Sequence, residues 1–148
     1  MTIQFDADFV WGAATSGPQA EGTFHKKHEN IFDYHYHTRP QDFYHNVGPD
    51  VASNFYNDYE NDLALLKQAG VQALRISIQW TRLIDDLEAG TVDPVGADYY
   101  RRVFKTMHQI GITPYVNLHH FDLPVTLQHQ YGGWQSKQMV DLYVRIAT

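Results

Sequence analysis

The 148-residue sequence predicts an α/β fold, namely the N-terminal part of a (β/α)8 barrel with roughly its first three strand–helix units. Three observations lead to this prediction. Strand and helix patterns alternate along the chain, which is typical of parallel strands that are covered by helices. Neither a GxGxxG nor a Walker-type phosphate loop is present, so the usual nucleotide-binding folds with this alternation lose support. A closed barrel typically needs about 250 residues, which is more than this chain contains.

The first strand–helix unit is interrupted by a long segment without a clear period. Phe9–Ala14 has the pattern of a short buried strand, and residues 15–50 are expected to form a long loop. A helix with Asp50 or Ser53 as its cap is expected next, and Gly70 is a natural residue to end it. The apolar stripe of this helix, at helical spacing, consists of Phe55, Tyr59, Leu63 and Leu66.

The second and third units follow more directly. Ala73–Ile78 is the next expected strand, Asp93-Pro94 opens a helix, and Ile112–Leu118 is the third strand. The stripe of the second helix consists of Tyr100, Val103, Phe104, Met107 and Ile110. A third helix is expected after a Ser136 cap, with Met139, Val140, Tyr143 and Ile146 as its stripe. Because this pattern reaches Thr148 without a stop signal, we expect residues 1–148 to be one incomplete domain.

The composition of the chain indicates which classes of molecule it is expected to bind. The net charge of −6 and the lack of a basic patch argue against binding to nucleic acid or acidic membranes. Cysteine is absent, the N-terminus has no secretory pattern, and no apolar run approaches the roughly 20 residues that span a membrane. A cytoplasmic location is therefore expected. The aromatic share of 14% suits a core and also suits a surface that binds sugars.

Strand alternation makes Arg75 a candidate functional residue. One face of the second strand carries Leu74, Ile76 and Ile78, and the other carries Arg75, Ser77 and Gln79. In a barrel the second set would point inward. A buried guanidinium needs an anionic partner, and a structural ion pair with Glu60 or Asp62 is the simpler explanation of Arg75.

A second candidate is Asn117–Pro124, NLHHFDLP, where a strand leads into a loop. Barrel enzymes place their sites at such positions. Alternation puts only one of His119 and His120 on the inner face and leaves open which one. Asp122 also suits an ordinary turn or cap.

The third candidate is Phe9–Gly22, FVWGAATSGPQAEG. Its small residues permit close backbone approach. The Gln19 amide can donate and accept at once, as a sugar hydroxyl requires, although a loop amide that bonds backbone is equally compatible with this stretch.

The histidines of the long loop suggest a metal-dependent hydrolase as a less favoured alternative. They are His25, His28, His35, His37 and His45. No HExxH helix and no cysteine accompany them, so neither a metal nor another cofactor is predicted.

Together these stretches resemble glycoside hydrolase family 1, the β-glucosidases and 6-phospho-β-glucosidases. FVWGAATSGPQAEG resembles the N-terminal signature of that family, RISIQWTR its second-strand motif and LHHFDLP its third-strand motif. The resemblance implies a TIM barrel and retaining hydrolysis by two carboxyl groups about 5 Å apart. It also implies that Gln19 and His120 bind sugar hydroxyls and that Arg75 holds the nucleophilic carboxylate. Phe121 occupies a position where many members have tryptophan.

The resemblance assigns no catalytic residue to this chain. The family carries its two glutamates in Asn-Glu-Pro and Glu-Asn-Gly motifs, and neither occurs here. We therefore expect the chain alone to be inactive and Glu21 to support the loop. The sequence of Ser16–Gln19 is more similar to the corresponding segment of the 6-phospho-β-glucosidases of bacteria than to that of plain β-glucosidases. A plain β-glucosidase, a non-catalytic sugar-binding or scaffold module, and a homo-oligomer all stay open as alternatives.

Overall fold

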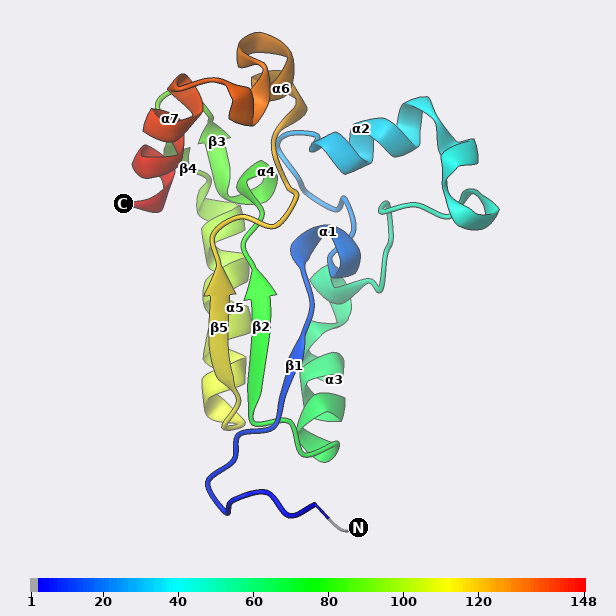
Figure 1. Cartoon of the computed structure of the whole chain (residues 1–148), viewed down its shortest axis with the longest axis vertical. Helices are drawn as coiled ribbons and strands as arrows, with labels where there is room; N and C mark the ends of the chain where they lie inside the picture. The colour runs from blue at the N-terminus through cyan, green and yellow to red at the C-terminus, as the bar shows by residue number, and fades with distance from the viewer. Residues whose placement is uncertain (1–2) are drawn as a thin grey trace.

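The computed structural model describes residues 3–148 and shows a parallel sheet beneath a cap of loops and short helices (Figure 1). The strand order is β1-β2-β5, and β3 and β4 form a separate hairpin. The strands are β1 Gly12–Ala14, β2 Ala73–Ser77, β3 Ile84–Asp86, β4 Thr91–Val92 and β5 Thr113–Asn117. The helices are α1 Gly17–Ala20, α2 Ile31–Thr38, α3 Phe55–Gln68, α4 Trp80–Leu83, α5 Pro94–Gln109, α6 Val125–Tyr131 and α7 Gln138–Ala147. Short 3₁₀ turns occupy Pro40–Asp42, Tyr44–Asn46 and Gly133–Gln135.

The three expected strands are confirmed, although each is shorter than its pattern, and β1, which was expected to be buried, is largely exposed. Gly12 is in register with Ala73, and Ser77 is in register with Asn117. All three strands run in the same direction, so their carboxyl ends lie at one edge of the sheet. The loops that follow them consequently meet there.

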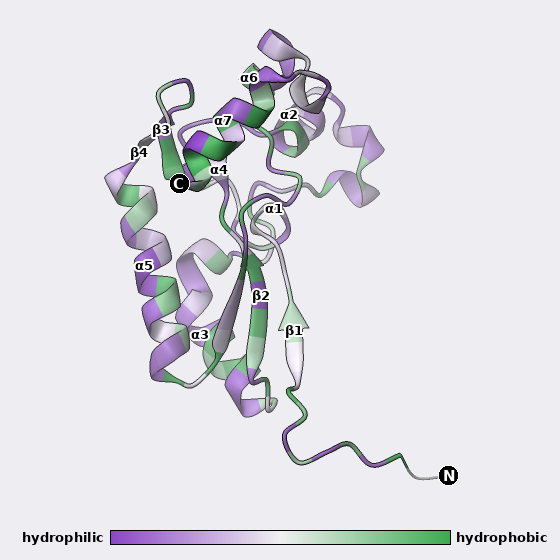
Figure 2. Cartoon of the chain, turned by 60° about the vertical axis from the view of Figure 1, so that its left-hand side comes forward, coloured by the Kyte–Doolittle hydropathy of each residue, from purple (hydrophilic) through white to green (hydrophobic). Residues whose placement is uncertain are grey.

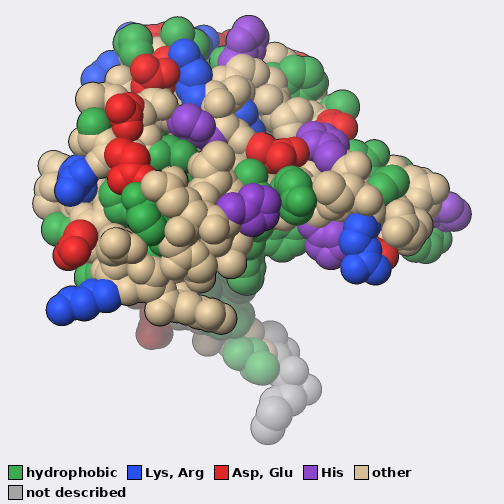
Figure 3. Space-filling view, turned by 90° about the horizontal axis from the view of Figure 1, so that it is seen from above, with side chains coloured by type: hydrophobic (Ala, Val, Ile, Leu, Met, Phe, Trp, Pro, Cys, Tyr) green, Lys and Arg blue, Asp and Glu red, His purple; other side chains and the backbone are tan. Residues whose placement is uncertain are grey.

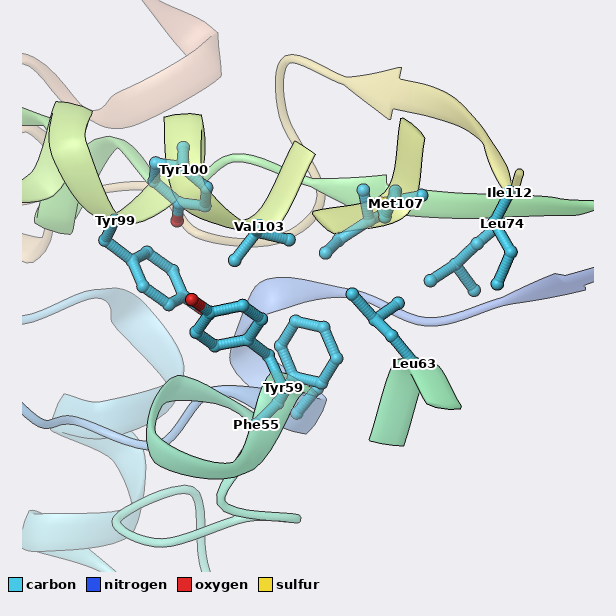
Figure 4. Close-up of a cluster of buried hydrophobic side chains, with 11 residues drawn as sticks. Phe55, Tyr59, Leu63, Leu74, Tyr99, Tyr100, Val103, Met107 and Ile112 are labelled. Atoms are coloured by element: carbon cyan, nitrogen blue, oxygen red, sulfur yellow. The ribbon is translucent and has the colours of Figure 1, made fainter. Parts of the chain in front are cut away.

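The helices α3 and α5 pack on the same face of the sheet, the arrangement that a barrel segment requires. Leu74 and Ile76 of β2 are buried against them, whereas Arg75 lies on the opposite face, as alternation predicts. Hydropathy colouring shows β2 as mostly hydrophobic and shows alternating hydrophobic and hydrophilic stretches along α3 and α5 (Figure 2). The core between them (Figure 4) consists of Phe55, Tyr59, Leu63, Leu74, Ile76, Tyr99, Tyr100, Val103, Met107, Ile112 and Ala20.

Helix α5 begins as expected, whereas the expected cap of α3 was wrong. Asp93 caps α5, because its side chain accepts a hydrogen bond from Gly96 N. The residue before α3 is Asn54, in the left-handed region at φ 60°, and neither Asp50 nor Ser53 caps the helix. Ser53 instead donates to the carbonyl of Ala20.

The expected long loop over residues 15–50 was wrong in part, because it contains α1 and α2. Asn30 accepts hydrogen bonds from the backbone N–H groups of Phe32 and Asp33, and the Asp33 carboxylate accepts one from Asn30 N. This reciprocal pair is a capping box, which fixes the start of α2.

Elements after β2 and β5 also differ from expectation. The hairpin β3–β4 precedes α5, and α6 precedes α7, in segments that lack a clear period in the sequence. Lys137, rather than Ser136, is the residue before α7, and Val140 of the expected stripe is exposed. These parts share a second core of Trp80, Ile84, Leu87, Leu123, Leu127, Met139 and Leu142. Among residues 3–148, no helix is long and apolar enough to cross a membrane.

We expect the chain to self-associate through its sheet edges. Within the described residues β1 and β5 each pair only with β2, and Val116 and Leu118 beside the β5 edge are 39% and 42% exposed. Val116→Lys should shift sedimentation profiles toward the monomer. Val140→Lys, at an exposed position of α7, is the matched control and should keep the wild-type sedimentation profile. A wild-type chain that stays monomeric over a concentration series would contradict this prediction.

Candidate active site

The candidate site is a cavity at the carboxyl ends of the strands, where barrel enzymes place their chemistry. Its volume is about 350 Å³. Figure 3 views this end of the molecule, toward which the strand arrows of Figure 1 point. The lining combines polar groups from the loops after β1 and β5 with an apolar wall from the segment around α2. It consists of Ser16, Pro18, Gln19, Phe32, Phe43, Val47, Gly48, Pro49, Ala52, His120 and Phe121.

Gln19 reaches this cavity because α1 packs tightly on the end of β2. The backbone N–H of Gly17 donates to Ser77 Oγ over 2.8 Å, and a Cβ on Gly17 would lie 2.3 Å from Gln79 Cγ. The small residue therefore permits close approach of α1 to β2, not to a ligand. Gln19 itself is exposed, and its Oε1 accepts a hydrogen bond from Ser16 Oγ over 2.7 Å.

The structure separates the two adjacent histidines. His120 lines the cavity with Gln19. His119 packs between two indole rings, with centroid distances of 5.4 Å to Trp80 and 5.0 Å to Trp134. Alternation left this choice open, and the geometry places His120 beside the candidate ligand space.

Arg75 contacts His120, not a carboxylate. Its Nη1 lies 2.7 Å from His120 Nδ1. The expected structural ion pair with Glu60 or Asp62 is absent among residues 3–148, where Glu60 accepts from Tyr59. The side of β2 that carries Arg75 faces away from α3, which explains why a carboxylate on that helix is not its partner.

Asp122 holds the loop that carries His120. Its carboxylate is fully buried, with Oδ1 accepting from His120 N over 2.9 Å and Oδ2 accepting from Trp80 N over 2.7 Å. Trp80 Nε1 in turn donates to the carbonyl of Leu118 over 2.7 Å. These bonds join the ends of β2 and β5, so the turn role suggested for Asp122 accounts for its burial.

Glu21 is the centre of a buried polar network beneath the cavity. Its Oε2 lies 2.8 Å from Arg82 Nε and also accepts from Gln79 Nε2 over 2.8 Å. The Tyr100 hydroxyl lies 3.1 Å from Oε1 of the same carboxylate. Both charged side chains are essentially inaccessible, at 0% for Glu21 and 1% for Arg82. The expectation that Glu21 supports the loop agrees with this arrangement.

Electrostatics keep Arg82 charged and Tyr100 protonated in this network. Burial is the largest influence and opposes the charge of Arg82, but the charge and hydrogen bond of Glu21, together with Tyr100 and Tyr99, outweigh it and raise the pKa of the guanidinium. Burial, followed by the nearby Glu21, raises the pKa of the Tyr100 hydroxyl well above its usual value. Tyr100 therefore stays a donor to Glu21, while Arg82 stays charged.

Comparison with known proteins identifies the family. The model of Glycosyl hydrolase family 1 matches residues 1–148, the whole chain. The chain belongs to glycosyl hydrolase family 1.

Curated relatives of this family 1 chain include two subclasses. The 6-phospho-beta-glucosidase GmuD of Bacillus subtilis (strain 168) is 40% identical over 97% of this chain and 31% of its own length. A chloroplastic benzoxazinyl glucoside beta-D-glucosidase of Triticum aestivum is 38% identical over 97% of this chain and 25% of its own length. The chain thus spans between a quarter and a third of these relatives.

Solved structures of the family share the fold. The rice Os3BGlu6 beta-glucosidase aligns with a TM-score of 0.88 at 34% identity, over 97% of this chain and 30% of the rice chain. A beta-glucosidase from Thermotoga maritima in complex with cyclophellitol gives the same TM-score and identity, over 33% of its chain. These neighbours are TIM-barrel enzymes, so the α/β barrel class predicted from the sequence is confirmed.

Sequence reasoning did not find the partners of several residues that shape the site of this family 1 chain. Arg82 and Gln79 lie within the quoted second-strand motif, but their partner Glu21 is about 60 positions away, so no local pattern joins them. Gln79 Oε1 also accepts from Asn30 Nδ2 over 3.2 Å, which ties the start of α2 to the network. The Asn30-x-x-Asp33 spacing is a capping signal that would have located α2.

Phe121 adopts a conformation that favours glycine. Its φ is 63°, the residue is 60% exposed, and its ring lies beside that of Phe32 at a centroid distance of 5.9 Å. A side chain in this region costs roughly 1–2 kcal/mol. We expect Phe121→Gly to be more stable than Phe121→Ala by about 1 kcal/mol in urea unfolding, although both lose the same ring. A Gly variant that is less stable than the Ala variant would contradict the strained backbone.

Two of the loop histidines have carboxylate neighbours, and residues 3–148 contain no group of three or more side chains arranged to hold a metal ion. His35 lies 2.8 Å from Asp42. His37 Nδ1 lies 2.6 Å from Glu29 and its Nε2 lies 2.9 Å from Asp50. The metal-dependent hydrolase therefore gains no support from the geometry.

We expect the contacts of His37 with Glu29 and Asp50 to stabilise the fold more at acidic than at alkaline pH. Hydrogen bonds from the ring to Glu29 and then to Asp50 raise the pKa of His37 above 6.5. A raised folded-state pKa contributes stability that is fully present below pH 6.5 and is lost as pH rises through the folded value. Urea unfolding at several pH values gives the free energies of unfolding of the wild type and His37→Gln. The difference between them should decrease as the pH rises above 6.5. A His37 NMR titration with a midpoint at or below 6.5 would contradict this.

Proposed function

We propose that residues 1–148 are the N-terminal part of a single TIM-barrel domain that hydrolyses β-glycosidic bonds with retention of configuration. One observation carries this proposal: Gln19 and His120, which come from different loops, converge on one cavity at the carboxyl ends of the strands. Membership of the family supplies the reaction class.

The chain provides the binding side of this reaction. Gln19 and His120 hold hydroxyls of the sugar, and the Phe121 ring forms part of the apolar wall. Arg75 faces the interior of the barrel, where it holds the nucleophilic carboxylate supplied elsewhere in the domain. Glu21 does not serve as nucleophile or acid, because it is fully buried and already engaged by Arg82 and Gln79. The chain alone is therefore inactive, since the covalent route needs both a nucleophile and an acid.

We propose 6-phospho-β-glucosides as the substrates. The wording of Ser16–Gln19 supports this choice, as does the 40% identity to a relative named 6-phospho-beta-glucosidase. The 38% identity to a plant glucosidase keeps unphosphorylated β-glucosides as the alternative. Because phosphorylated sugars do not cross membranes unaided, this substrate also implies action in the cytoplasm.

Two nitrophenyl substrates test the proposal. The longer polypeptide that carries this chain is assayed with nitrophenyl 6-phospho-β-glucoside and with its unphosphorylated analogue, alongside the 148-residue chain. We expect turnover of the phosphorylated substrate by the longer polypeptide and none by the chain. A preference for the unphosphorylated substrate would overturn the substrate assignment. If neither substrate is hydrolysed, the proposed hydrolase activity is overturned.

A non-catalytic sugar-binding module is the second candidate, because the binding residues are present without either catalytic motif. The coding sequence after Thr148 discriminates between the two. An Asn-Glu-Pro motif after the next strand supports the enzyme, whereas a stop codon directly after Thr148 supports the module.

A further inference from the structure

The surroundings of His120 Nδ1 determine which ring nitrogen carries the proton. Arg75 Nη1 lies 2.7 Å from this nitrogen, and Asn117 Nδ2 lies 3.5 Å from it. A guanidinium has only donors, because none of its nitrogens accepts a hydrogen bond. His120 Nδ1 must therefore accept, so it carries no hydrogen.

We propose that Arg75 is a positioning residue that fixes His120 as the neutral tautomer with hydrogen on Nε2. The imidazolium form is excluded by the same contact, since it would place an N–H against the N–H of Arg75. His120 therefore presents a donor, not an acceptor, on its Nε2 side. This adds a second role to Arg75, exerted through His120.

The backbone of His120 is held independently of Arg75. The fully buried Asp122 accepts from His120 N, so the loop position does not depend on the guanidinium. Removing the guanidinium should consequently change the tautomer more than the place of the ring.

Gln19 is restricted in the same sense. Its Oε1 accepts from Ser16 Oγ over 2.7 Å, which directs the amide N–H₂ group to other partners. His120 Nε2 and the Gln19 amide nitrogen then each present an N–H donor to the cavity. Resting on the proposed function, the inference is that the sugar hydroxyls they contact accept with their oxygen atoms and donate their own protons elsewhere.

Nitrogen NMR of the ¹⁵N-histidine-labelled chain tests the tautomer without any sugar. Magic-angle-spinning spectra suit both monomeric and associated chains. In the wild type we expect a non-protonated shift for His120 Nδ1 and a protonated shift for Nε2. Arg75→Met should produce a mixture of tautomers or the opposite one. Arg102→Met, which removes an exposed arginine of α5, is the matched control and should keep the wild-type His120 signals.

Two results would overturn the proposal: a protonated Nδ1 in the wild type, or an unchanged tautomer in folded Arg75→Met. If Arg75→Met does not fold, the wild-type spectrum still decides, and Arg75→Lys, which retains a donor, should keep the wild-type tautomer. A changed tautomer in folded Arg75→Lys would also count against the proposal.

Fluorinated substrates test the consequence in the longer polypeptide. Fluorine accepts weakly and cannot donate, so replacing the His120-bound hydroxyl by fluorine in a bound, unreacted glycoside should weaken the Kd roughly tenfold less than replacing it by hydrogen. Equal losses would show that His120 accepts. If the spectra give the expected tautomer but no glycoside is cleaved, the proposed function fails while the positioning role of Arg75 stands.

Discussion

Replacing Arg82 by methionine is expected to lower the free energy of unfolding by about 3–5 kcal/mol. The substitution leaves the Glu21 carboxylate buried without its cationic partner, and the two side chains are 1% and 0% exposed in the intact pair. Arg82 also donates to the carbonyl groups of Gly22 and Phe24, which would lose their partners as well. A small domain is stable by only about 5–15 kcal/mol, so this variant should be close to unfolding at room temperature.

The size of the loss follows from how many segments the pair joins. Arg82 stacks on Tyr56 of α3, with its Cζ 4.2 Å from the ring centroid, and Glu21 accepts from Tyr100 of α5. Gln79 connects the same carboxylate to Asn30 at the start of α2. Losing the guanidinium therefore weakens the loop after β1 and both packed helices at once.

Urea unfolding followed by circular dichroism measures this effect. Arg102→Met is the matched control, because Arg102 forms an exposed i,i+4 pair with Asp98 that should contribute at most about 1 kcal/mol. The double variant Arg82→Met with Glu21→Gln should recover part of the loss but not all, since the two carbonyls still lack donors. An Arg82→Met loss of less than about 1 kcal/mol would contradict the buried pair.

Capping residues and apolar spacing were sufficient to predict the repeated strand–helix units of the fold. Asp93 followed by Pro94 marks the start of α5, and the apolar spacing from Tyr100 to Met107 matches its buried side. Alternation along β2 correctly assigned Arg75 to the face opposite Leu74. Such patterns succeed because each element buries one side against a common core.

Local signals failed where partners are distant in the sequence or where an element buries little. Alternation gives the face on which Arg75 lies but not its partner, and His120 is 45 positions away. Helix α2 was missed because Asp33 is its one buried residue, so it has no apolar period. In the sequence, nothing distinguishes Glu21 from other polar loop residues. Its partner Arg82 lies beside it only because α1 packs on the end of β2.

His120→Ala and Gln19→Ala are each expected to reduce kcat/KM of the longer polypeptide about 10- to 100-fold. Each substitution removes a hydrogen-bonding group that faces the cavity, and an unsatisfied partner costs about 1–3 kcal/mol. The double variant should lose less than the product of the two single losses, because both groups hold the same sugar.

Folding can be separated from binding in this experiment. Gln19 is exposed, and among the described residues its side chain forms one hydrogen bond, to Ser16, so Gln19→Ala should keep the wild-type melting temperature. His129→Ala on α6 removes an exposed imidazole that does not line the cavity, and it should retain wild-type kcat/KM. If His120→Ala and Gln19→Ala both retain full activity with intact folds, the cavity they share does not hold the sugar. The binding role of the loops after β1 and β5 would then have to be abandoned, because those two side chains are what unite the loops at one cavity.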